Sequence, residues 1–443
     1  MNNKIERKSR AIFTICCRNY IAFAATLMNS IREHNPNCDR YIILCEDSAK
    51  LPTGIQVDAS VVSAVDLKIA NFRKMAFGYD LIELNTCIKP SAIKYLLSKG
   101  YDEVMYLDPD IEVFDELIPL WPSAHNSCTV LTPHITSRYP DRCRPSETDV
   151  LANGLYNLGF LSVADTSESL AFLDWWEQKC QTIGFDDKSG NLFVDQKFCD
   201  MVPILFKGVY ISGHLGANIA YWNLHERIVT QKDGRFLING KWVLLFYHYS
   251  GIGINCKTSI SKHTDRFTLE NRPDLNQLFG EYREKVIKNG YLITKDLEYS
   301  FGFTNEGRPI LKIERLLFLA NHKSEKILNP FDRKRYDNQR EWYLRDPSKL
   351  SNLSMSPASY NNQQYRILLD LSNCILKCIC WLITTPRYIQ LCSRLEKAFR
   401  LRTHVNLLSR NYSNPSPVEL SLGPSVSEKS PLPNCRISTG PIT

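Results

Sequence analysis

The sequence predicts an α/β fold with a mostly parallel central sheet. Short apolar runs of strand length, separated by segments with helical periodicity, occupy residues 11–17, 41–45, 57–65 and 104–107. Strands that alternate with helices favour βαβ units with right-handed crossovers, which build parallel sheets. Pro90 suits the first turn of a helix over residues 91–98 that ends at Gly100. In such a sheet we expect ligands at the carboxyl ends of the strands.

Two carboxylates directly follow the fourth apolar run. Residues 104–107 resemble a short buried strand, and Pro109 cannot continue it as a central strand because it has no backbone donor. Side chains alternate along an extended chain, so Asp108 and Asp110 point to the same side and can share one hard cation. The same three residues are equally compatible with a surface turn that binds no ion.

Further candidate site residues stand elsewhere in the chain. They are Tyr20 after the first strand, Asn157 and Gly159, Asp195 and Gln196, and His248 with the turn Ser250-Gly251. Gly159 allows a ligand or another backbone to approach closely, and the backbone donors of the Ser250-Gly251 turn can meet phosphate oxygens. Tyr20 can stack on a base or pack at the edge of the core. A lone His at a strand end is more often structural, so a ligand role for His248 requires that the fold bring it beside Asp108.

Composition and charge limit the function classes. The chain has 443 residues and a formal net charge of +7, and residues 346–443 supply +6 of it through 11 Lys and Arg against 5 Asp and Glu. The remainder is nearly neutral, which argues against nucleic acid as a partner of the main body. The 15 Cys show no zinc-finger spacing, and we find neither a secretory signal nor an apolar run of 18 residues. We therefore expect reduced thiols in a cytoplasmic chain.

We expect five regions along the chain. They are the α/β domain (1–300), a helical extension (301–345), a linker (346–364), a basic amphipathic helical segment (365–405) and a disordered tail (406–443). A basic amphipathic helix can lie on an anionic membrane surface, and it can equally cap the α/β domain or dimerise.

The order of the motifs resembles the GT-A nucleotide-sugar glycosyltransferases. The branch concerned is the bacterial one that is similar to glycogenin-like and lipopolysaccharide-galactosyltransferase-like enzymes. The resemblance covers about residues 10–290 and rests on the ordered motifs Asp108-Pro-Asp110, Asn157-Leu-Gly159, Asp195-Gln196 and His248-Tyr-Ser-Gly251. Residues 218–223 and 261–263 also look like parts of that branch. The resemblance implies a Rossmann-like GT-A sheet.

The resemblance also implies a metal site. Asp108, Asp110 and His248 would hold Mn²⁺, or Mg²⁺, on the diphosphate of the donor, where the cation stabilises the charge of the departing nucleotide. An imidazole among carboxylates suits Mn²⁺ better than Mg²⁺, which prefers oxygen ligands and water.

Other roles implied by the resemblance concern the donor and the reaction. Thr14 and Tyr20 would meet the nucleobase, Lys89 the donor phosphate or sugar, and Asn157 and Asp195 the sugar hydroxyls. Gln196 matches the place where retaining members put a group on the reacting face of the sugar. A glutamine is a poor nucleophile, and Asp195 can equally serve as a base. Retention and inversion therefore both stay open.

The sequence thus predicts a metal-dependent glycosyltransferase that uses a nucleoside-diphosphate-sugar, with a UDP-sugar foremost. The acceptor would be a glycan or a lipid-linked molecule, in surface polysaccharide or lipopolysaccharide biosynthesis, with peripheral contact to the inner face of an anionic membrane. A nucleotidyltransferase on a similar sheet would need a glycine-rich phosphate loop, and residues 18–20 contain no glycine. A non-catalytic protein that binds a sugar nucleotide or a glycan would tolerate a damaged metal triad, and here all three candidate ligands are present.

Overall fold

The computed structural model describes residues 8–310, 314–315, 318–319 and 329–332. All of them belong to the unit Met1–Asn361. The expected linker, basic amphipathic segment and tail, and most of the helical extension, lie outside the described residues, so these expectations stay predictions. Among the described residues, no helix is long and apolar enough to cross a membrane. Cys16 and Cys17 are buried free thiols.

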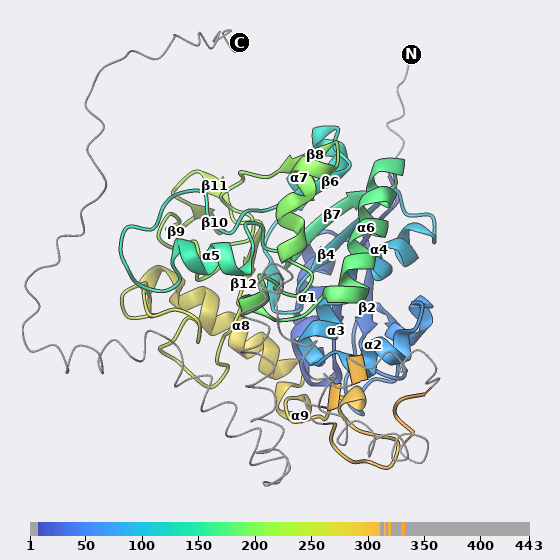
Figure 1. The fold of residues 1–443 in the computed structure, drawn as a ribbon. Helices are drawn as coiled ribbons and strands as arrows, with labels where there is room; N and C mark the ends of the chain where they lie inside the picture. The colour runs from blue at the N-terminus through green and yellow to red at the C-terminus, as the bar shows by residue number, and fades with distance from the viewer. Residues whose placement is uncertain (1–7, 311–313, 316–317, 320–328, 333–443) are drawn as a thin grey trace, which may run out of the picture. The chain divides into compact units, whose positions relative to one another are not determined.

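A seven-stranded sheet forms the centre of this unit (Figure 1). In spatial order its strands are β3 (Ser60–Ser63), β2 (Asp39–Leu44), β1 (Arg10–Cys16), β4 (Glu103–Leu107), β7 (Phe160–Ala164), β6 (Thr129–Leu131) and β8 (Val209–Ile211). Neighbouring strands pair in parallel, except that β7 runs antiparallel to both β4 and β6. The predicted α/β fold with a mostly parallel sheet is confirmed.

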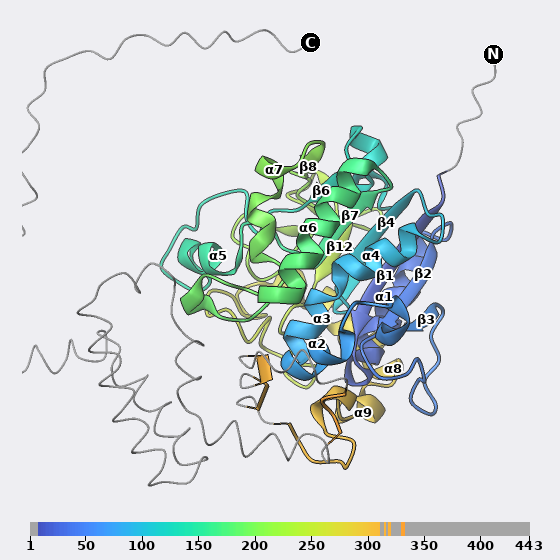
Figure 2. The ribbon, with the colours of Figure 1, turned by 45° about the vertical axis from the view of Figure 1, so that its right-hand side comes forward.

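Helices cover both faces of the sheet. They are α1 (Ile21–His34), α2 (Phe72–Gly78), α3 (Leu81–Cys87), α4 (Lys89–Leu97), α5 (Glu147–Asn153), α6 (Ser167–Ile183), α7 (Val202–Leu205), α8 (Asn276–Lys288) and α9 (Tyr291–Thr294). Figure 2 shows α4 and α6 over one face of the sheet. The predicted helix at residues 91–98 is α4, and Pro90 lies in its first turn.

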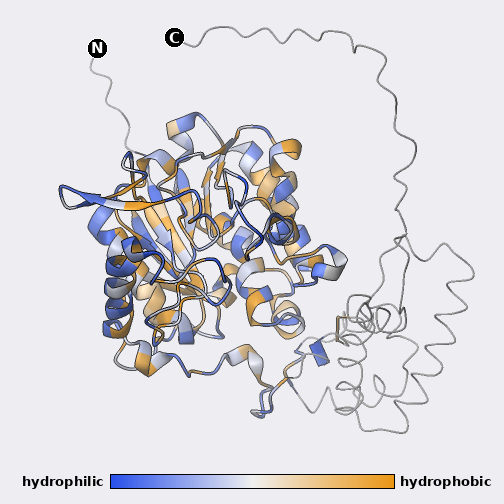
Figure 3. Ribbon diagram, turned by 90° about the vertical axis from the view of Figure 1, so that its left-hand side faces the viewer, coloured by the Kyte–Doolittle hydropathy of each residue, from blue (hydrophilic) through white to orange (hydrophobic). Residues whose placement is uncertain are grey.

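The alternation of side chains along the strands creates one core on each face. In β1, Phe13 and Ile15 pack in the core that holds α3, α4 and α6, whereas Ile12 and Cys16 pack in the core that holds α1. In Figure 3 the strands in the interior are largely hydrophobic. Burial of this apolar surface is the main force that holds the layers together.

A third core surrounds two smaller sheets. One sheet consists of β9 (Val229–Lys232), β10 (Arg235–Ile238) and β11 (Trp242–Val243), and the other pairs β5 (Ile111–Val113) with β12 (Phe246–His248) in antiparallel register. Tyr249, directly after β12, stacks on Tyr282 of α8 with a centroid separation of 3.7 Å. This packing fixes the end of β12 against the body.

A buried arginine ties the last described residues to α2. The Arg315 guanidinium donates to the carbonyl oxygens of Phe77 (2.8 Å), Tyr79 (2.6 Å) and Phe301 (2.8 Å), and also to that of Ala76 (3.1 Å). A planar fork with five donors can serve these diverging carbonyls at once, which an ammonium group cannot do with the same geometry.

We therefore expect Arg315→Lys to lower the free energy of unfolding by about 2–4 kcal/mol, because buried carbonyls lose their donors. Urea denaturation measures the change. The matched control is Arg235→Lys, whose side chain is 69% exposed. Equal effects of the two substitutions would contradict a specific role for the guanidinium fork.

Candidate active site

The carboxyl end of β4 presents the two predicted carboxylates. The strand stops at Leu107, and the Asp108 amide donates to the Gly159 carbonyl oxygen at 2.8 Å. The Ile111 amide donates back to the Asp108 carbonyl oxygen at 3.1 Å, which closes a turn around Pro109. Backbone hydrogen bonds thus fix both carboxylates at the edge of the sheet.

His248 reaches this turn through the pairing of β5 with β12. In that pair His248 lies opposite Ile111, and the Tyr249 amide donates to the Asp110 carbonyl oxygen at 2.8 Å. Because His248 is the last residue of β12, the register places its side chain beside the residues that precede β5. The fold therefore meets the condition that the sequence set for His248.

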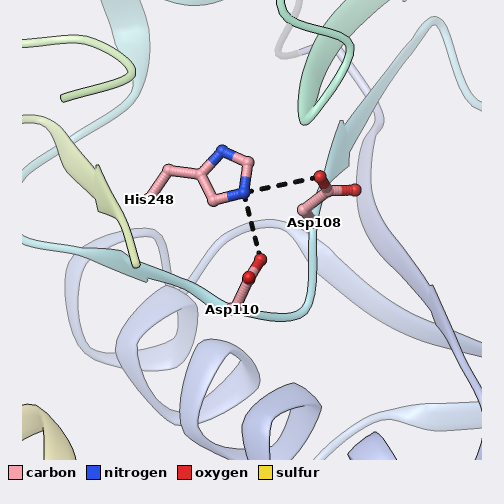
Figure 4. A group of neighbouring side chains, drawn as sticks. All are labelled: Asp108, Asp110 and His248. Atoms are coloured by element: carbon pink, nitrogen blue, oxygen red, sulfur yellow. Dashed lines mark ion pairs between the residues drawn. The ribbon is translucent and has the colours of Figure 1, made fainter. Parts of the chain in front are cut away.

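The three side chains converge on one point, as Figure 4 shows. The Nε2 atom of His248 lies 3.1 Å from Asp110 Oδ1 and 3.5 Å from Asp108 Oδ2. One ligand atom from each residue lies within 4.8 Å of the others. The side chains of His248, Asp110 and Asp108 are 4%, 14% and 30% exposed, so the cluster opens on the side of Asp108.

The chemistry of this cluster fits a divalent cation. Burial would lower the pKa of His248, but the charge of Asp110, its hydrogen bond and the charge of Asp108 raise it overall. The Nε2 atom and one oxygen of each carboxylate thus face the place that a cation would take. The other oxygen of Asp108 accepts a hydrogen bond from the Tyr106 hydroxyl at 2.6 Å, which orients the carboxylate.

Gly159 belongs to the same cluster for a steric reason. A Cβ atom there would lie 2.5 Å from His248 Cε1 and 2.8 Å from Asp108 Oδ2. Only glycine lets the start of β7 approach the carboxylates this closely. The sequence predicted the approach of a ligand or a backbone at Gly159, and in the structure the nearest groups are side chains of the cluster.

Asn157 is oriented by Asn218, which lies in the range 218–223 that the resemblance includes, and by His134, which was not among the predicted site residues. Its Oδ1 accepts hydrogen bonds from Asn218 Nδ2 (3.1 Å) and the Gly159 amide (3.2 Å), and its Nδ2 lies 3.3 Å from Nε2 of His134. Trp222 packs edge-on against both His134 and His248. The left-handed backbone of Asn218, with φ of +52°, has no signature in sequence that distinguishes it from a loop residue.

Lys89 and Asp195 form a buried ion pair beside the cluster. The Lys89 ammonium lies 2.7 Å from Asp195 Oδ2, donates to the Leu158 carbonyl oxygen at 2.8 Å and sits 4.4 Å from the centre of the Tyr106 ring. Burial would lower the pKa of Lys89, but the charges of Asp195 and Asp108 raise it, so the ammonium persists. Lys89 is only 2% exposed. It reaches the cluster through Tyr106 rather than from an open surface.

Gln196 makes hydrogen bonds to the backbone with both ends of its amide. Its Oε1 accepts from the Leu158 amide (2.9 Å) and its Nε2 donates to the Asn153 carbonyl oxygen (3.0 Å). Val194, two residues before Gln196, has φ of +40°, a strained conformation for a β-branched residue. Such strain, about 1–3 kcal/mol, persists where the surroundings enforce it and often marks a functional segment.

A mostly apolar cavity of about 350 Å³ opens beside Asp108 and Asp110, between the end of β1 and α3. Tyr20, in the short 3-10 helix η1 (Arg18–Tyr20), lines it and stacks on Phe23. Thr14 lies inside β1, is 0% exposed and does not line this cavity. The turn at Ser250 and Gly251 directly follows His248, and the φ of Gly251 is +73°.

Removal of one partner of the Lys89–Asp195 pair should be costly. We expect Lys89→Met to lower the free energy of unfolding by about 3–5 kcal/mol, since it leaves a buried carboxylate unpaired. The double substitution Lys89→Met with Asp195→Leu should recover at least about 2 kcal/mol. Urea denaturation of both variants checks this. A double variant no more stable than the single one would contradict the coupling.

His134 should make stability depend on pH. Burial lowers its pKa from 6.5 to about 4. Above pH 6.5 both the folded and unfolded states carry the neutral ring. As the pH falls towards 4, only the unfolded state binds the proton, so about 3 kcal/mol of stability is lost. His134→Gln should remove this contribution, and parallel pH profiles of stability for the two proteins would contradict it.

No family model matches the chain. A comparison with curated proteins does find relatives. The chain is 28% identical over 253 residues to the uncharacterized protein YfnD of Bacillus subtilis (strain 168), which covers 54% of this chain and 76% of that protein. It is 24% identical over 302 residues to the uncharacterized protein YfnF of the same strain, which covers 67% of this chain and 98% of that protein.

Three of the solved structures that match the chain are glycosyltransferases. An active-site mutant of LgtC matches with a TM-score of 0.29 and 17% identity, over 48% of this chain and 75% of that one. The galactosyltransferase LgtC in complex with donor and acceptor sugar analogs matches with a TM-score of 0.27 and 16% identity, over 48% and 76%. A glycosyltransferase involved in the glycosylation of the major capsid of PBCV-1 matches with a TM-score of 0.29 and 11% identity, over 48% and 85%.

Proposed function

We propose that the chain is a metal-dependent glycosyltransferase that uses a nucleoside-diphosphate-sugar. The observation that carries this proposal is the convergence of Asp108, Asp110 and His248 at the carboxyl end of β4. In an α/β sheet this edge is where ligands bind. The same three residues belong to the ordered motifs that resemble GT-A glycosyltransferases.

The donor would lie across the cluster. Its base would enter the apolar cavity and stack on Tyr20, and its diphosphate would extend to Asp108 and Asp110, which line the same cavity. A divalent cation held by Asp108, Asp110 and His248 would offset the negative charge of the departing diphosphate. The imidazole in this donor set favours Mn²⁺ over Mg²⁺.

The remaining residues of the site would position the sugar. Asn157, oriented by His134 and Asn218, can donate to a sugar hydroxyl if the His134 contact gives way. Asp195 and Lys89 are paired at 2.7 Å and would stiffen the segment beside the donor; burial raises the pKa of Asp195, and the charge and hydrogen bond of Lys89 oppose that shift. The side-chain amide of Gln196 is hydrogen-bonded to the backbone of Leu158 and Asn153. Gln196 would therefore influence the position of the sugar through its own backbone or through neighbouring residues.

The finer assignments are proposals of the same kind. We favour a UDP-sugar as donor, a glycan or lipid-linked molecule as acceptor, and surface polysaccharide assembly as the setting. A cytoplasmic location with peripheral membrane contact would involve residues 365–405, which lie outside the described residues.

Truncation before residue 365 should then release the protein from anionic vesicles.

Substitution of a proposed metal ligand tests the function. UDP, GDP or CDP with Mn²⁺ should raise the melting temperature of the wild-type protein, and a chelator should abolish the shift. Asp110→Asn should weaken this binding about 100-fold or more, because even residues that only orient metal ligands contribute 10- to 100-fold in affinity.

The matched control is Asp296→Asn, at a side chain that is 83% exposed. It should bind the nucleotide as the wild type does. Unchanged nucleotide affinity in Asp110→Asn would sink the metal assignment, and the absence of a shift with every nucleotide would sink the proposed function.

A further inference from the structure

A second cavity, which we name the Lys262 pocket, is lined by residues from the segments 144–153 and 262–265 and by residues 188 and 221. Its volume is about 270 Å³. The lining residues that matter here are Arg144, Asp149, Lys188, Tyr221, Lys262 and Asp265. The two cavities share no lining residue. The site therefore offers two separate places for ligands.

The Lys262 pocket is connected to the metal-ligand cluster through packed rings. His248 packs edge-on against Trp222 at 5.2 Å between centroids, Trp222 contacts Tyr221 at 5.0 Å, and Tyr221 contacts His263 at 5.8 Å. The Lys262 amide also donates to the Gly251 carbonyl oxygen at 3.1 Å. The pocket thus adjoins the turn that follows His248.

Close packing fixes the loop that carries Lys262. A Cβ atom on Gly251 would lie 2.6 Å from both Ser261 Oγ and His263 Cδ2, so the loop rests directly on the glycine. The Ser261 hydroxyl oxygen in turn accepts from the His263 amide at 3.2 Å. The position of Lys262 relative to the metal-ligand cluster is therefore set by the backbone.

The pocket carries three cationic side chains and two carboxylates, and both carboxylates are held by contacts to residues 144–146. Asp265 Oδ1 accepts from the Arg144 amide at 2.6 Å, and Asp149 Oδ2 accepts from the Ser146 amide at 2.9 Å while its other oxygen lies 3.5 Å from the Arg144 guanidinium. Within the described part of the chain, Lys188 and Lys262 have no ion-pair partner.

The cationic groups act together on one residue of the pocket. Burial and the charges of Lys262, Lys188 and Arg144 lower the pKa of His263. Arg144, Lys188 and Lys262 come from separate segments of the chain and line the same small cavity. Cationic side chains that gather in one cavity, two of them without an ion-pair partner among the described residues, favour an anionic ligand.

We propose that the Lys262 pocket binds an anionic group, a phosphate or a carboxylate, on the acceptor molecule. This inference rests on the proposed function and extends it to the substrate class of the acceptor. The donor diphosphate has its own compensation in the cation held by the cluster, whereas the pocket has a separate set of cations. Arg144 suits either anion because a guanidinium can bind two oxygens at once.

The reaction places the acceptor between the pocket and the donor. An acceptor hydroxyl oxygen forms the new bond to the anomeric carbon. The bond from that carbon to the diphosphate oxygen breaks, and its electron pair leaves with the nucleoside diphosphate. The hydroxyl proton passes to the departing phosphate oxygen or to a carboxylate of the site. The anionic group in the pocket takes no part in this exchange and only anchors the acceptor.

Calorimetry on the metal-free, full-length protein tests the anchor. Glucose 6-phosphate and glucuronate serve as probes for the two anions, and glucose is the neutral reference. We expect at least one anionic probe to bind tenfold or more tightly than glucose, and the stronger of the two identifies the anion. Lys262→Glu and Arg144→Gln should each weaken that binding about tenfold or more, whereas Lys99→Glu, at the opposite end of β4, should not.

A second measurement distinguishes a failure of the acceptor inference from a failure of the proposed function. Lys262→Glu should retain chelator-sensitive binding of UDP with Mn²⁺, which also shows that it is folded. Loss of UDP binding in this variant, or equal binding of glucose and both anions, would overturn the acceptor inference and leave the proposed function intact. Absence of metal-dependent nucleotide binding in the wild type would overturn the proposed function and the acceptor assignment with it.

Discussion

The antiparallel pairing of β5 with β12 is the constraint on which the candidate site depends. It brings His248 to the turn that holds Asp108 and Asp110, and the hydrogen bond from the Tyr249 amide to the Asp110 carbonyl oxygen fixes the register. A slip of one residue would turn the His248 side chain to the opposite face. The aromatic packing of Tyr249 on α8 therefore serves the site as well as the core.

Charge balance is the second requirement, because the cluster concentrates negative charge in a partly buried place. Asp108 has Tyr106 and His248 as partners, and the neighbouring Asp195 has Lys89. Buried charges are stable only when they are paired and hydrogen-bonded. The Lys89–Asp195 pair therefore stabilises the wall of the site, which accounts for a lysine and an aspartate that are almost fully buried.

Features that depend on local sequence patterns could be predicted from the sequence. The apolar run before Asp108, the stop at Pro109 and the alternation of side chains were sufficient for β4 and its two carboxylates. The partners of Lys89, Gln196 and Asn157 could not be predicted, because their contacts join segments separated by more than twenty residues and depend on the packing of loops. Thr14 illustrates the same limit: its place in β1 was clear, but the face on which its side chain is buried follows from α1.

The contrast between the two cavities bears on how such a site can discriminate between substrates. An apolar wall that carries an aromatic ring can bind a nucleobase by stacking. This interaction excludes water and needs few charged side chains. A pocket with Lys188, Lys262 and Arg144 attracts an anion over a longer range and rejects neutral molecules that leave its cations unpaired. Because the two cavities share no lining residue, the proposed donor and acceptor would each be selected by a different interaction.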